Sequence, residues 1–568
     1  MSDSAPPSGP RPVVEPIPQQ GGPDRAERYL EIETKLEAEA TFQVPPLADH
    51  PRLRELGAAS VTAPAERELD AVYYDTDRLD LLHARVTLRR RTGGDDAGWH
   101  LKLPAGAGAR TELRLPLSGN GSGGDDVPDG LAELVRGAAR GRPLRPVARL
   151  RTRRTARHVL DAAGTPLVEI ADDDVTALAL VPEGAQEQRW RELEVEIEAG
   201  TPDLLNAVVA ALLAAGARVS ASASKVGRLL DPGAARPAEP SSPTALPAAV
   251  AVANYLRRQR DLLIGADIAI RSGDLDPEAP HSARTAIRRI RAILAVAHRM
   301  LPGDLTDELA VRLAQIGRAI SDVRDLDVVR GRFEAWSDVR RDPDEAAVES
   351  SRRIRERLAA MRNDRSRALL RLLESTGYLQ LLRDMDALVT DTATRPAASV
   401  ADALAGPIDE AQSRLADHAR RALALLAATD EHPEVYDSRR DALMHRIRKD
   451  AKTVRYAADA AAGAGGETGA AMADLAASLE QVQDVLGAHQ DAVTAIATAR
   501  AIDSESGLDP SLRRVLQGWW QHETSERVRA LTQFAELWPA LWIGSGVDPT
   551  GGPGDPPSGR SGGQHGGG

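Results

Sequence analysis

The segment Leu30–Glu37 reads LEIETKLE and alternates apolar or small side chains with charged ones. One face of an extended chain here carries Leu30, Ile32, Thr34 and Leu36, and the other carries Glu31, Glu33, Lys35 and Glu37. Because successive side chains of a β-strand point to opposite faces, this period of two predicts a strand. The same alternation recurs near residues 86–91, 99–103, 110–115, 168–173 and 192–198. We therefore expect an antiparallel sheet within residues 26–230, with flanking helices such as 202–215.

The polar faces of these strands carry charges of both signs and few Ser, Thr or Asn residues. On an open sheet these charges would be solvated ion pairs, whereas in a closed sheet they would line a cavity. Because gathering and desolvating charge is costly, such a cavity is typical of a binding site. Its basic residues would bind phosphate oxygens, and its carboxylates would bind Mg²⁺ or Mn²⁺. The pattern alone leaves both arrangements open.

The candidate lining residues fall into an acidic and a basic group. The acidic group is Glu31, Glu33, Glu112, Glu169, Asp173, Glu194 and Glu196. The basic group is Lys35, Arg89, Arg91, Lys102, Arg110, Arg151 and Arg153.

Composition excludes several classes of protein. The 568 residues carry 72 Lys and Arg against 84 Asp and Glu, a net charge of −12 that argues against a general nucleic-acid binder. There is no Cys, which excludes disulfides, thiolate metal sites and Cys nucleophiles. Aromatic residues make up 3%, too few for a base-stacking surface. No apolar run reaches the roughly 18 residues of a membrane span, and residues 1–24 lack a signal-peptide pattern. We therefore expect a cytoplasmic protein with no membrane partner.

The chain divides by composition into five parts. Residues 1–25 and 544–568 are Pro-, Gly- and Ser-rich tails that we expect to be disordered, and residues 231–247 read as an interdomain linker. Residues 26–230 hold the strands, and residues 248–543 have helical periodicity throughout. The expected fold class is therefore an α+β domain followed by an all-α helical bundle.

Several motifs in the strand-rich part occur in the order of one family. EIETK at Glu31–Lys35 resembles the ExExK signature of the CYTH family, the triphosphate tunnel metalloenzymes. Further motifs similar to its strands are YYDT at 73–76, LRRRTGG at 88–94, WHLKLP at 99–104, RTELRLPL at 110–117, LRTRR at 150–154, VEIADDDV at 168–175, ELEVEIE at 192–198 and SKVGR at 224–228. The resemblance implies an eight-stranded antiparallel β-tunnel that acts on a triphosphate.

The resemblance also implies roles for individual residues. The divalent metal, Mg²⁺ or Mn²⁺, would be held by Glu31, Glu33, Glu194 and Glu196. The phosphates would be bound by Lys35, Arg89, Arg91, Lys102, Arg110, Arg151, Arg153 and Lys225. Lys35 would take part in catalysis with Glu169 or Asp173, whose carboxylates would hold a second metal or position the attacking water. Arg114 departs from the family, because many members have an acidic residue there, and it leaves the number of metal ions open.

The helical part contains a repeated basic pattern, HSARTAIRRIR at 281–291 and HRIRKDAKTVR at 445–455. Each copy has His at i and basic residues at i+3, i+7 and i+10, which fall within an arc of about 80° on a helix. The stripes are His281, Arg284, Arg288 and Arg291, and His445, Arg448, Lys452 and Arg455, with Lys449 beside the second. A solvated helix face would interleave acidic residues at i±4, so repeated like charge favours a polyanion partner. The two histidines could instead cap helices or lie in the core.

This part resembles the CHAD domain, with repeats near 250–335 and 410–500 and a related segment after each stripe, at 320–329 and 485–494. The family is associated with polyphosphate, which implies that the stripe residues and Lys449 bind it. A linear polyanion suits a basic surface that lacks aromatic residues.

The function predicted is metal-dependent hydrolysis of inorganic triphosphate or short polyphosphate in the tunnel, with the helical domain binding polyphosphate. The protein would lie in the cytoplasm or at polyphosphate granules. One alternative is a non-catalytic polyphosphate-binding or granule-associated protein. Another is an enzyme acting on an organic triphosphate, such as thiamine triphosphate or a nucleoside triphosphate, or an adenylate cyclase. Nucleic acid is a weak candidate, and no protein partner is indicated.

Overall fold

The computed structural model describes residues 27–104, 109–117, 126–180, 187–230, 248–273, 278–298, 301–339, 344–394, 404–427, 438–463, 466–505 and 507–542. The predicted tails and linker, 1–25, 231–247 and 544–568, lie outside these residues. The chain forms two compact units, Met1–Ser241 with Ile264–Asp276, and Ser242–Leu263 with Pro277–Gly568. Among the described helices, none is long and apolar enough to cross a membrane.

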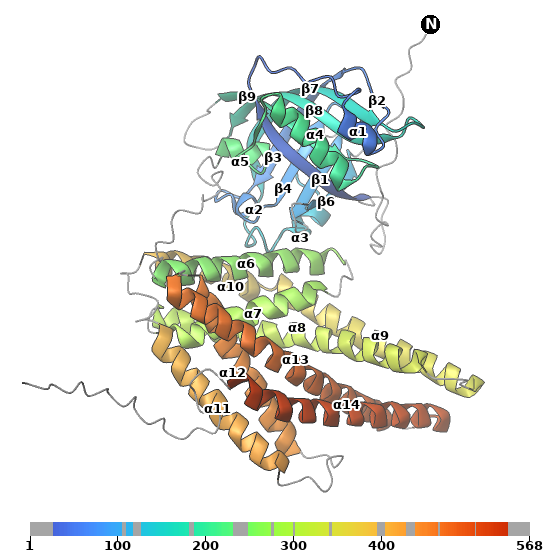
Figure 1. Ribbon diagram of the computed structural model, residues 1–568, viewed down its shortest axis with the longest axis vertical. Helices are drawn as coiled ribbons and strands as arrows, with labels where there is room; N and C mark the ends of the chain where they lie inside the picture. The colour runs from blue at the N-terminus through green and yellow to red at the C-terminus, as the bar shows by residue number, and fades with distance from the viewer. Residues whose placement is uncertain are drawn as a thin grey trace, which may run out of the picture. The chain divides into compact units, whose positions relative to one another are not determined.

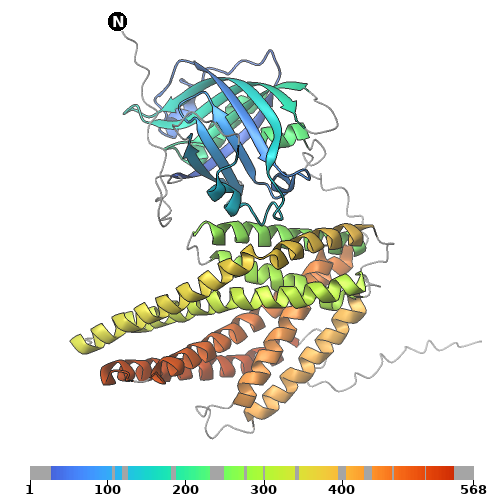
Figure 2. The same cartoon turned by 180° about the vertical axis from the view of Figure 1, so that it is seen from behind.

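The first unit is a closed antiparallel sheet (Figures 1 and 2). Its long strands are β1 (Glu27–Ala38), β3 (Ala65–Asp75), β4 (Thr87–Thr92), β5 (Gly98–Pro104), β6 (Ala109–Pro116), β7 (Arg145–Leu160), β8 (Pro166–Ala179) and β9 (Glu187–Ile197). They follow the order β1-β6-β5-β4-β3-β7-β8-β9, and β9 pairs with β1 again. Two short strands, β2 (Ser60–Val61) and β10 (Arg218–Val219), pair with β7 and β1. The predicted eight-stranded tunnel is therefore confirmed, and the open sheet is excluded.

The apolar faces of the strands point outward and are covered by helices. Leu36, Ile170 and Val195 lie in one cluster with Leu204 and Val208 of α4 (Pro202–Ala214). Figure 1 shows α4 lying across the outer side of these strands, close to α1 (Pro51–Glu55). The side chain of Thr201 accepts a hydrogen bond from the N–H of Leu204, so α4 begins where the sequence predicts. Because helices bury the apolar faces, the charged faces are left inside the tunnel.

One end of the tunnel is filled by apolar side chains. Tyr73, Leu150 and Val175 point inward there and contact Val226 and Leu229 of α5 (Lys225–Leu230). The helix α2 (Asp80–His83) adds Leu82 to the same cluster, while α3 (Asp129–Leu134) precedes β7. This apolar end fixes α5, and with it the position of Lys225.

The described part of the second unit is helical, as predicted (Figures 1 and 2). Its helices are α6 (Ala248–Arg271, of which residues 248–263 belong to this unit), α7 (Glu278–Val296), α8 (Gly303–Asp338), α9 (Glu345–Glu374), α10 (Thr376–Ala393), α11 (Gly406–Ala427), α12 (Ser438–Ala462), α13 (Gly466–Asp503) and α14 (Pro510–Trp542). The two helices that carry the basic stripes, α7 and α12, pack against each other. α7 also packs on α8, and α12 on α13, so each stripe helix is followed by a helix in contact with it.

Candidate functional site

The strand register places charged residues on the inner face of the tunnel. Lys35 faces Glu194, Glu33 faces Glu196, and Glu196 faces Glu169 across neighbouring strands. On the other side of β1, Glu31 faces Arg110. Side chains on one face of a sheet alternate along each strand and meet across strands, so these residues share one interior surface.

A buried ion network occupies the middle of the tunnel. Lys35 forms ion pairs with Glu33 at 3.3 Å and with Glu194. Lys225 reaches in from α5 and lies 2.7 Å from Glu194, 2.8 Å from Glu192 and 3.0 Å from Asp173. Although burial opposes it, these carboxylates raise the pKa of Lys225 and Lys35 above their ordinary values, so both remain cations. Lys225, Lys35 and Arg154 in turn hold the pKa of Glu194 well below its usual range, against the effect of burial.

Arg154 is the tunnel-lining arginine of β7. Its guanidinium donates hydrogen bonds to both carboxylate oxygens of Asp173, at 2.8 and 2.7 Å, and to Glu194 at 2.6 Å. Its side chain is 16% exposed. The sequence predicted Arg151 and Arg153 as the phosphate ligands of this strand, and that prediction was wrong. Their side chains are 66% and 61% exposed and pair with Asp70 and Asp174 on the outer face. The error is one residue of register, which exchanges the two faces of a strand.

Arg89 and Arg91 of β4 form a cationic region opposite the carboxylates. Arg89 donates to the hydroxyl of Tyr73 at 3.3 Å, and Arg91 pairs with Asp96. Burial, together with the charges of Arg89 and Arg154, holds the pKa of Arg91 well below its ordinary value. The buried Nε atoms of Arg89 and Arg91 have no hydrogen-bond partner within the described residues. This region therefore has positive charge and donor capacity for an anion.

The ExE carboxylates can accept a cation. Lys102 donates to Oε1 of Glu31 at 2.5 Å, while the buried Oε2 of Glu31 has no hydrogen-bond partner among the described residues. Glu33 is 7% exposed, and Lys35 and Lys102 lower its pKa although burial opposes them. A buried carboxylate pair in which one oxygen has no hydrogen-bond partner among the described residues fits the hard oxygen ligands that Mg²⁺ or Mn²⁺ requires.

Arg110, also predicted to bind phosphate, donates to the backbone carbonyl of Ala223 at 2.9 Å. It ties β6 to the segment that precedes α5. Arg110 thus lies on the inner face of the tunnel, where its charge also helps to lower the pKa of Glu33.

The structure adds interior residues that sequence reasoning missed. His100 is 1% exposed, and its ring nitrogens lie 2.9 Å from Glu112 and 2.8 Å from the carbonyl oxygen of Asp96. Glu112 also accepts from Nε of Arg114 at 2.7 Å. Arg114, the departure from the family pattern, lies 4.6 Å from the ring centre of Tyr29. Glu192 is missing from the predicted metal set, although it is adjacent to Lys225. His100 and Glu192 could have been found by extending the inward parity of Lys102 and Glu194 by two residues.

The two basic stripes of the helical unit meet. Arg284 and Arg288 of α7 lie near Arg448 and Lys452 of α12, close enough for their charges to affect one another. Burial, then Arg448, Arg288 and Arg284, lower the pKa of Lys452 to about 5. Burial, then Arg284 and Arg448, lower the pKa of Arg288 to about 9. The opposing charges are Asp325, 2.5 Å from Arg284, and Asp491, whose field acts on Arg448.

We call Arg284, Arg288, Arg448 and Lys452 the stripe cluster. The buried Nε atoms of Arg284 and Arg448 lack hydrogen-bond partners within the described residues. Like charges held together and desolvated, with unused donors, are the physical signature of an anion site.

The remaining stripe residues lie outside this cluster or are paired. Arg455 is bound to Glu480 at 2.5 Å and to Gln483 at 3.2 Å. Arg291 and Lys449 are exposed. His281 is also exposed, and His445 accepts or donates at 2.8 Å with Gln490. Neither histidine is a core residue.

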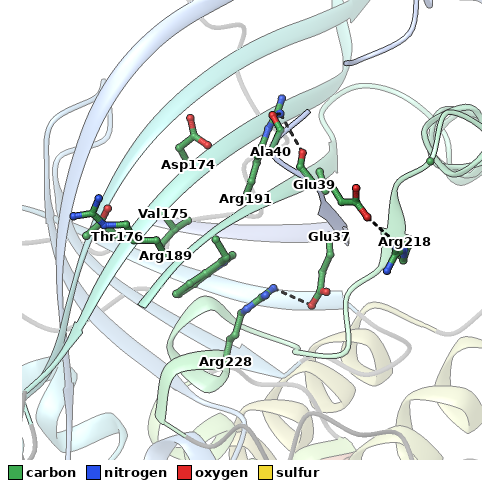
Figure 3. Close-up of a pocket in the computed structure, with 13 residues that line it drawn as sticks. Glu37, Glu39, Ala40, Asp174, Val175, Thr176, Arg189, Arg191, Arg218 and Arg228 are labelled. Carbon is green, nitrogen blue, oxygen red and sulfur yellow. Dashed lines mark hydrogen bonds and ion pairs between the residues drawn. The ribbon is translucent and has the colours of Figure 1, made fainter. Parts of the chain in front are cut away.

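A surface pocket of about 460 Å³ lies where β1 ends and β10 begins, beside β8 and β9 (Figure 3). Its charges are already matched: Arg228 donates to Glu37 at 2.9 Å and lies 5.1 Å from the ring centre of Trp190, and Arg218 donates to Glu39 at 2.7 Å. The predicted site residues are not among those that line it.

Known domain families match both units. The CYTH domain family matches residues 30–228, and the CHAD domain family matches residues 254–500. Together with the closed tunnel and its charged interior, these matches define a triphosphate tunnel protein with a helical second domain. CYTH domains are of the metalloenzyme type and generally act on triphosphates.

Two curated proteins of Mycobacterium tuberculosis extend the match to most of the chain. MT2285 of strain CDC 1551 / Oshkosh and Rv2226 of strain ATCC 25618 / H37Rv, both described as uncharacterized, are 36% identical over 488 residues. The alignment covers 83% of this chain and 88% of each relative. The chain therefore belongs to the family of proteins that join a CYTH domain to a CHAD domain.

Solved structures give weaker matches. PptA from Streptomyces chartreusis has a TM-score of 0.41 at 21% identity, over 52% of this chain and 99% of its own. The CHAD domain from the plant Ricinus communis has a TM-score of 0.39 at 20% identity, over 53% and 92%. Family membership rests on the sequence matches.

Proposed function

We propose that this protein hydrolyses inorganic triphosphate or short polyphosphate in the tunnel, using a divalent metal ion, and binds longer polyphosphate on the helical unit. The strongest support for a reaction in the tunnel is that a cationic region faces a carboxylate region inside it. Arg89 and Arg91, with unused donors, face a carboxylate region that contains Glu31, Glu33 and Glu194. A phosphate chain with a bound cation neutralises both regions at once.

Different residues of the tunnel would bind the phosphates and the metal ion. Arg89, Arg91, Arg154, Lys102 and Lys225 would hold the phosphate oxygens and offset their charge as the bond to the leaving phosphate breaks. Glu31 and Glu33, with Glu194 and Glu196, would hold Mg²⁺ or Mn²⁺, which supplies Lewis-acid stabilisation of phosphate charge when bound. Asp173, whose pKa is kept low by Arg154 and Lys225 despite burial, would stay ionised and orient those two cations.

The tunnel is also the reason to favour a phosphate chain without a large organic group. The interior positions carry closely spaced charged side chains. The apolar space beside Tyr73, Leu150 and Val175 is already occupied by side chains of α5. A ring system would find neither a free aromatic face nor an apolar space among the described interior residues, whereas phosphates would find donors.

Phosphate release from a panel of substrates tests the tunnel proposal. Triphosphate, pyrophosphate, ATP and thiamine triphosphate are compared with Mg²⁺ and with Mn²⁺. The proposal expects the highest kcat/KM with triphosphate. A preference for ATP or thiamine triphosphate, or release of pyrophosphate from ATP with ring closure, would replace it with the organic-triphosphate alternative. Tight binding without turnover would favour the alternative of a non-catalytic polyphosphate-binding protein.

Polyphosphate binding by the helical unit is supported by the stripe cluster. Fluorescence anisotropy of labelled long-chain polyphosphate should show binding that weakens steeply with salt, because each phosphate contact releases a counterion. The variant Arg288→Gln/Arg448→Gln should bind at least ~10-fold more weakly. Arg291→Gln, an exposed arginine of the same stripe, is the matched control and should have little effect. Equal binding by both variants would reject the assigned surface.

A further inference from the structure

Two basic side chains of the stripe cluster lack an acidic partner within the described part of the chain. Arg284 pairs with Asp325 of α8 at 2.5 Å, and Asp491 of α13 is the other carboxylate whose field reaches the cluster. By contrast, Arg288 and Lys452 form no ion pair or hydrogen bond with any described residue. The four basic side chains therefore share two carboxylates.

Helix packing holds the four basic side chains together. Within each stripe, the two residues of the cluster are four positions apart, which places them on one face of their helix, roughly 6 Å apart. The helices α7 and α12 pack against each other. Ile287 and Ile447, which precede Arg288 and Arg448 in sequence, are 1% and 0% exposed. Neither helix can turn the basic residues apart without exposing this apolar surface to water.

Lys452 is the member of the cluster that can relieve the repulsion by losing a proton. An arginine side chain keeps its proton in a protein, whereas the pKa of a lysine shifts readily on burial. Burial, followed by the charges of Arg448, Arg288 and Arg284, holds the pKa of Lys452 at about 5. The amine is therefore neutral at pH 7, and added negative charge beside it would favour the ammonium form.

Other charged groups on the helices around α12 are engaged elsewhere. These contacts are Asp450 with His418 of α11 at 2.6 Å, Arg455 with Glu480 of α13 at 2.5 Å, Asp459 with Tyr255 of α6 at 3.2 Å, and Asp441 with Arg527 of α14 at 3.1 Å. On α7, Arg289 lies 5.6 Å from the ring centre of Tyr456. Asp491 is the carboxylate whose field reaches Lys452, and burial raises its pKa. Burial also lowers the pKa of His281, so this histidine is neutral above pH 7.

We propose that polyphosphate binding at the stripe cluster is coupled to proton uptake by Lys452, so that the helical unit binds the polyanion more tightly as the pH falls. This inference rests on the proposed polyphosphate binding and adds its regulation by pH. The proton comes from solvent and converts the neutral amine of Lys452 to an ammonium. A ligand that raises the proton affinity of a group binds more tightly when that group is protonated, because the two equilibria are linked. Uptake of one proton lowers the affinity by up to ~10-fold for each unit of rising pH.

Calorimetry in buffers of different ionisation enthalpy counts the protons. Long-chain polyphosphate is titrated with the full chain at pH 8.0 in Tris and in HEPES, and the difference in heat gives the protons taken up per chain. We expect about one proton for the wild type and for Lys449→Met, which removes an exposed lysine of the same helix. Lys452→Arg carries its charge before binding, so it should bind without this uptake. Unchanged uptake in Lys452→Arg would overturn the proposal.

Lysine NMR tests the free protein separately. The chain has only five lysines, so labelling lysine with ¹³C at Cε gives five signals, and Lys452→Arg identifies that of Lys452. We expect a neutral amine at pH 8.0 that becomes an ammonium when polyphosphate is added. An ammonium in the free protein at this pH would overturn the proposal.

Fluorescence anisotropy with labelled polyphosphate separates this proposal from the function on which it rests. Between pH 7 and pH 8 the affinity of the wild type should fall by up to ~10-fold, and that of Lys452→Arg should change much less. Binding by both proteins with the same pH dependence would overturn the proton coupling and leave polyphosphate binding intact. No binding by either protein would overturn both.

Discussion

Arg153 and Arg154 are neighbours in sequence, but they have different electrostatic environments. Arg153 pairs with Asp174 on the outer face and is 61% exposed, where an ion pair contributes little. Arg154 is inside, bound to Asp173 and Glu194, and lies at the boundary between the carboxylates and the cationic region. Comparing variants of these two residues therefore distinguishes a role in the tunnel from the general effect of removing an arginine.

The first prediction compares these two arginines. Arg154→Gln should lower kcat/KM for triphosphate at least ~100-fold, because it removes a cation from the phosphate path. Arg153→Gln should change it less than about twofold. Steady-state phosphate release measures both, and a melting curve checks that Arg154→Gln still folds with Asp173 unpaired. Equal losses of kcat/KM in the two variants would mean that the inner face of β7 is assigned wrongly.

The second prediction concerns Lys452, whose pKa lies near 5 instead of its ordinary 10.5. Between these values the unfolded chain binds a proton there that the folded chain does not, so stability rises with pH across this window. Lys452→Met should therefore raise the melting temperature of the helical unit, by ~2–4 °C for each ~1 kcal/mol gained, and more at pH 6 than at pH 9. The same variant should bind polyphosphate more weakly. A fall in the melting temperature would mean that Lys452 is an ordinary structural cation.

Among the strands, the period-two alternation was enough to predict the sheet and which face of β1 is charged, whereas its closure into a tunnel was implied by the resemblance to the CYTH family. It failed on β7, where LRTRR has basic residues of both parities and a continuous charged run gives no signal for the inward face. The register with β8, in which Arg154 faces Asp173, decides it. The inward position of Lys225 could be anticipated only from the resemblance, because α5 is a short helix whose placement depends on the apolar end of the tunnel.

The third prediction is for β1 and α4. Leu36 is fully buried between them, whereas Leu30, on the same face of β1, is 47% exposed. Leu36→Ala should lower the free energy of unfolding of the tunnel by about 2–5 kcal/mol, and Leu30→Ala by less than about 1 kcal/mol. Hydrogen exchange of strand amides in urea measures the tunnel apart from the helices. If both variants lower the free energy of unfolding by the same amount, α4 does not cover the apolar face as described.

The sequence shows the two basic stripes, but it does not show that they lie close together. Helical periodicity places Arg284 and Arg288 on one face of α7 and Arg448 and Lys452 on one face of α12. Only the packing of α7 against α12 brings the four together, and it leaves Arg455 paired with Glu480 and Arg291 exposed. Periodicity within a helix cannot distinguish these outcomes, because each depends on which neighbouring helix supplies the carboxylate.

For the whole molecule, the two units have complementary tasks under the proposed function. A helical unit that retains a long polyanion raises the local concentration of phosphate ends near the tunnel of the same chain. Four of the five lysines of the chain, Lys35, Lys102, Lys225 and Lys452, lie in the two charged sites. A compact ammonium is thus used mainly at the two places where phosphate is expected.

The fourth prediction tests this cooperation. Arg288→Gln/Arg448→Gln should lower kcat/KM for long-chain polyphosphate by about 10-fold or more and leave kcat/KM for triphosphate unchanged, since a short substrate gains nothing from tethering. Chain-length-resolved phosphate release measures both values. A matching loss for triphosphate would mean that the stripe cluster acts through the fold of the tunnel and not through tethering.

Replacing both ExE carboxylates by amides removes their charge while keeping their shape. Phosphate release from inorganic triphosphate is measured for the full chain and for Glu31→Gln/Glu33→Gln, with Mg²⁺, with Mn²⁺ and with chelator. We expect release that requires the metal and that falls at least ~100-fold in the variant, with an unchanged circular dichroism spectrum. Equal release by the two proteins, or release that persists in chelator, would mean that phosphates and a metal ion are not held together inside the tunnel.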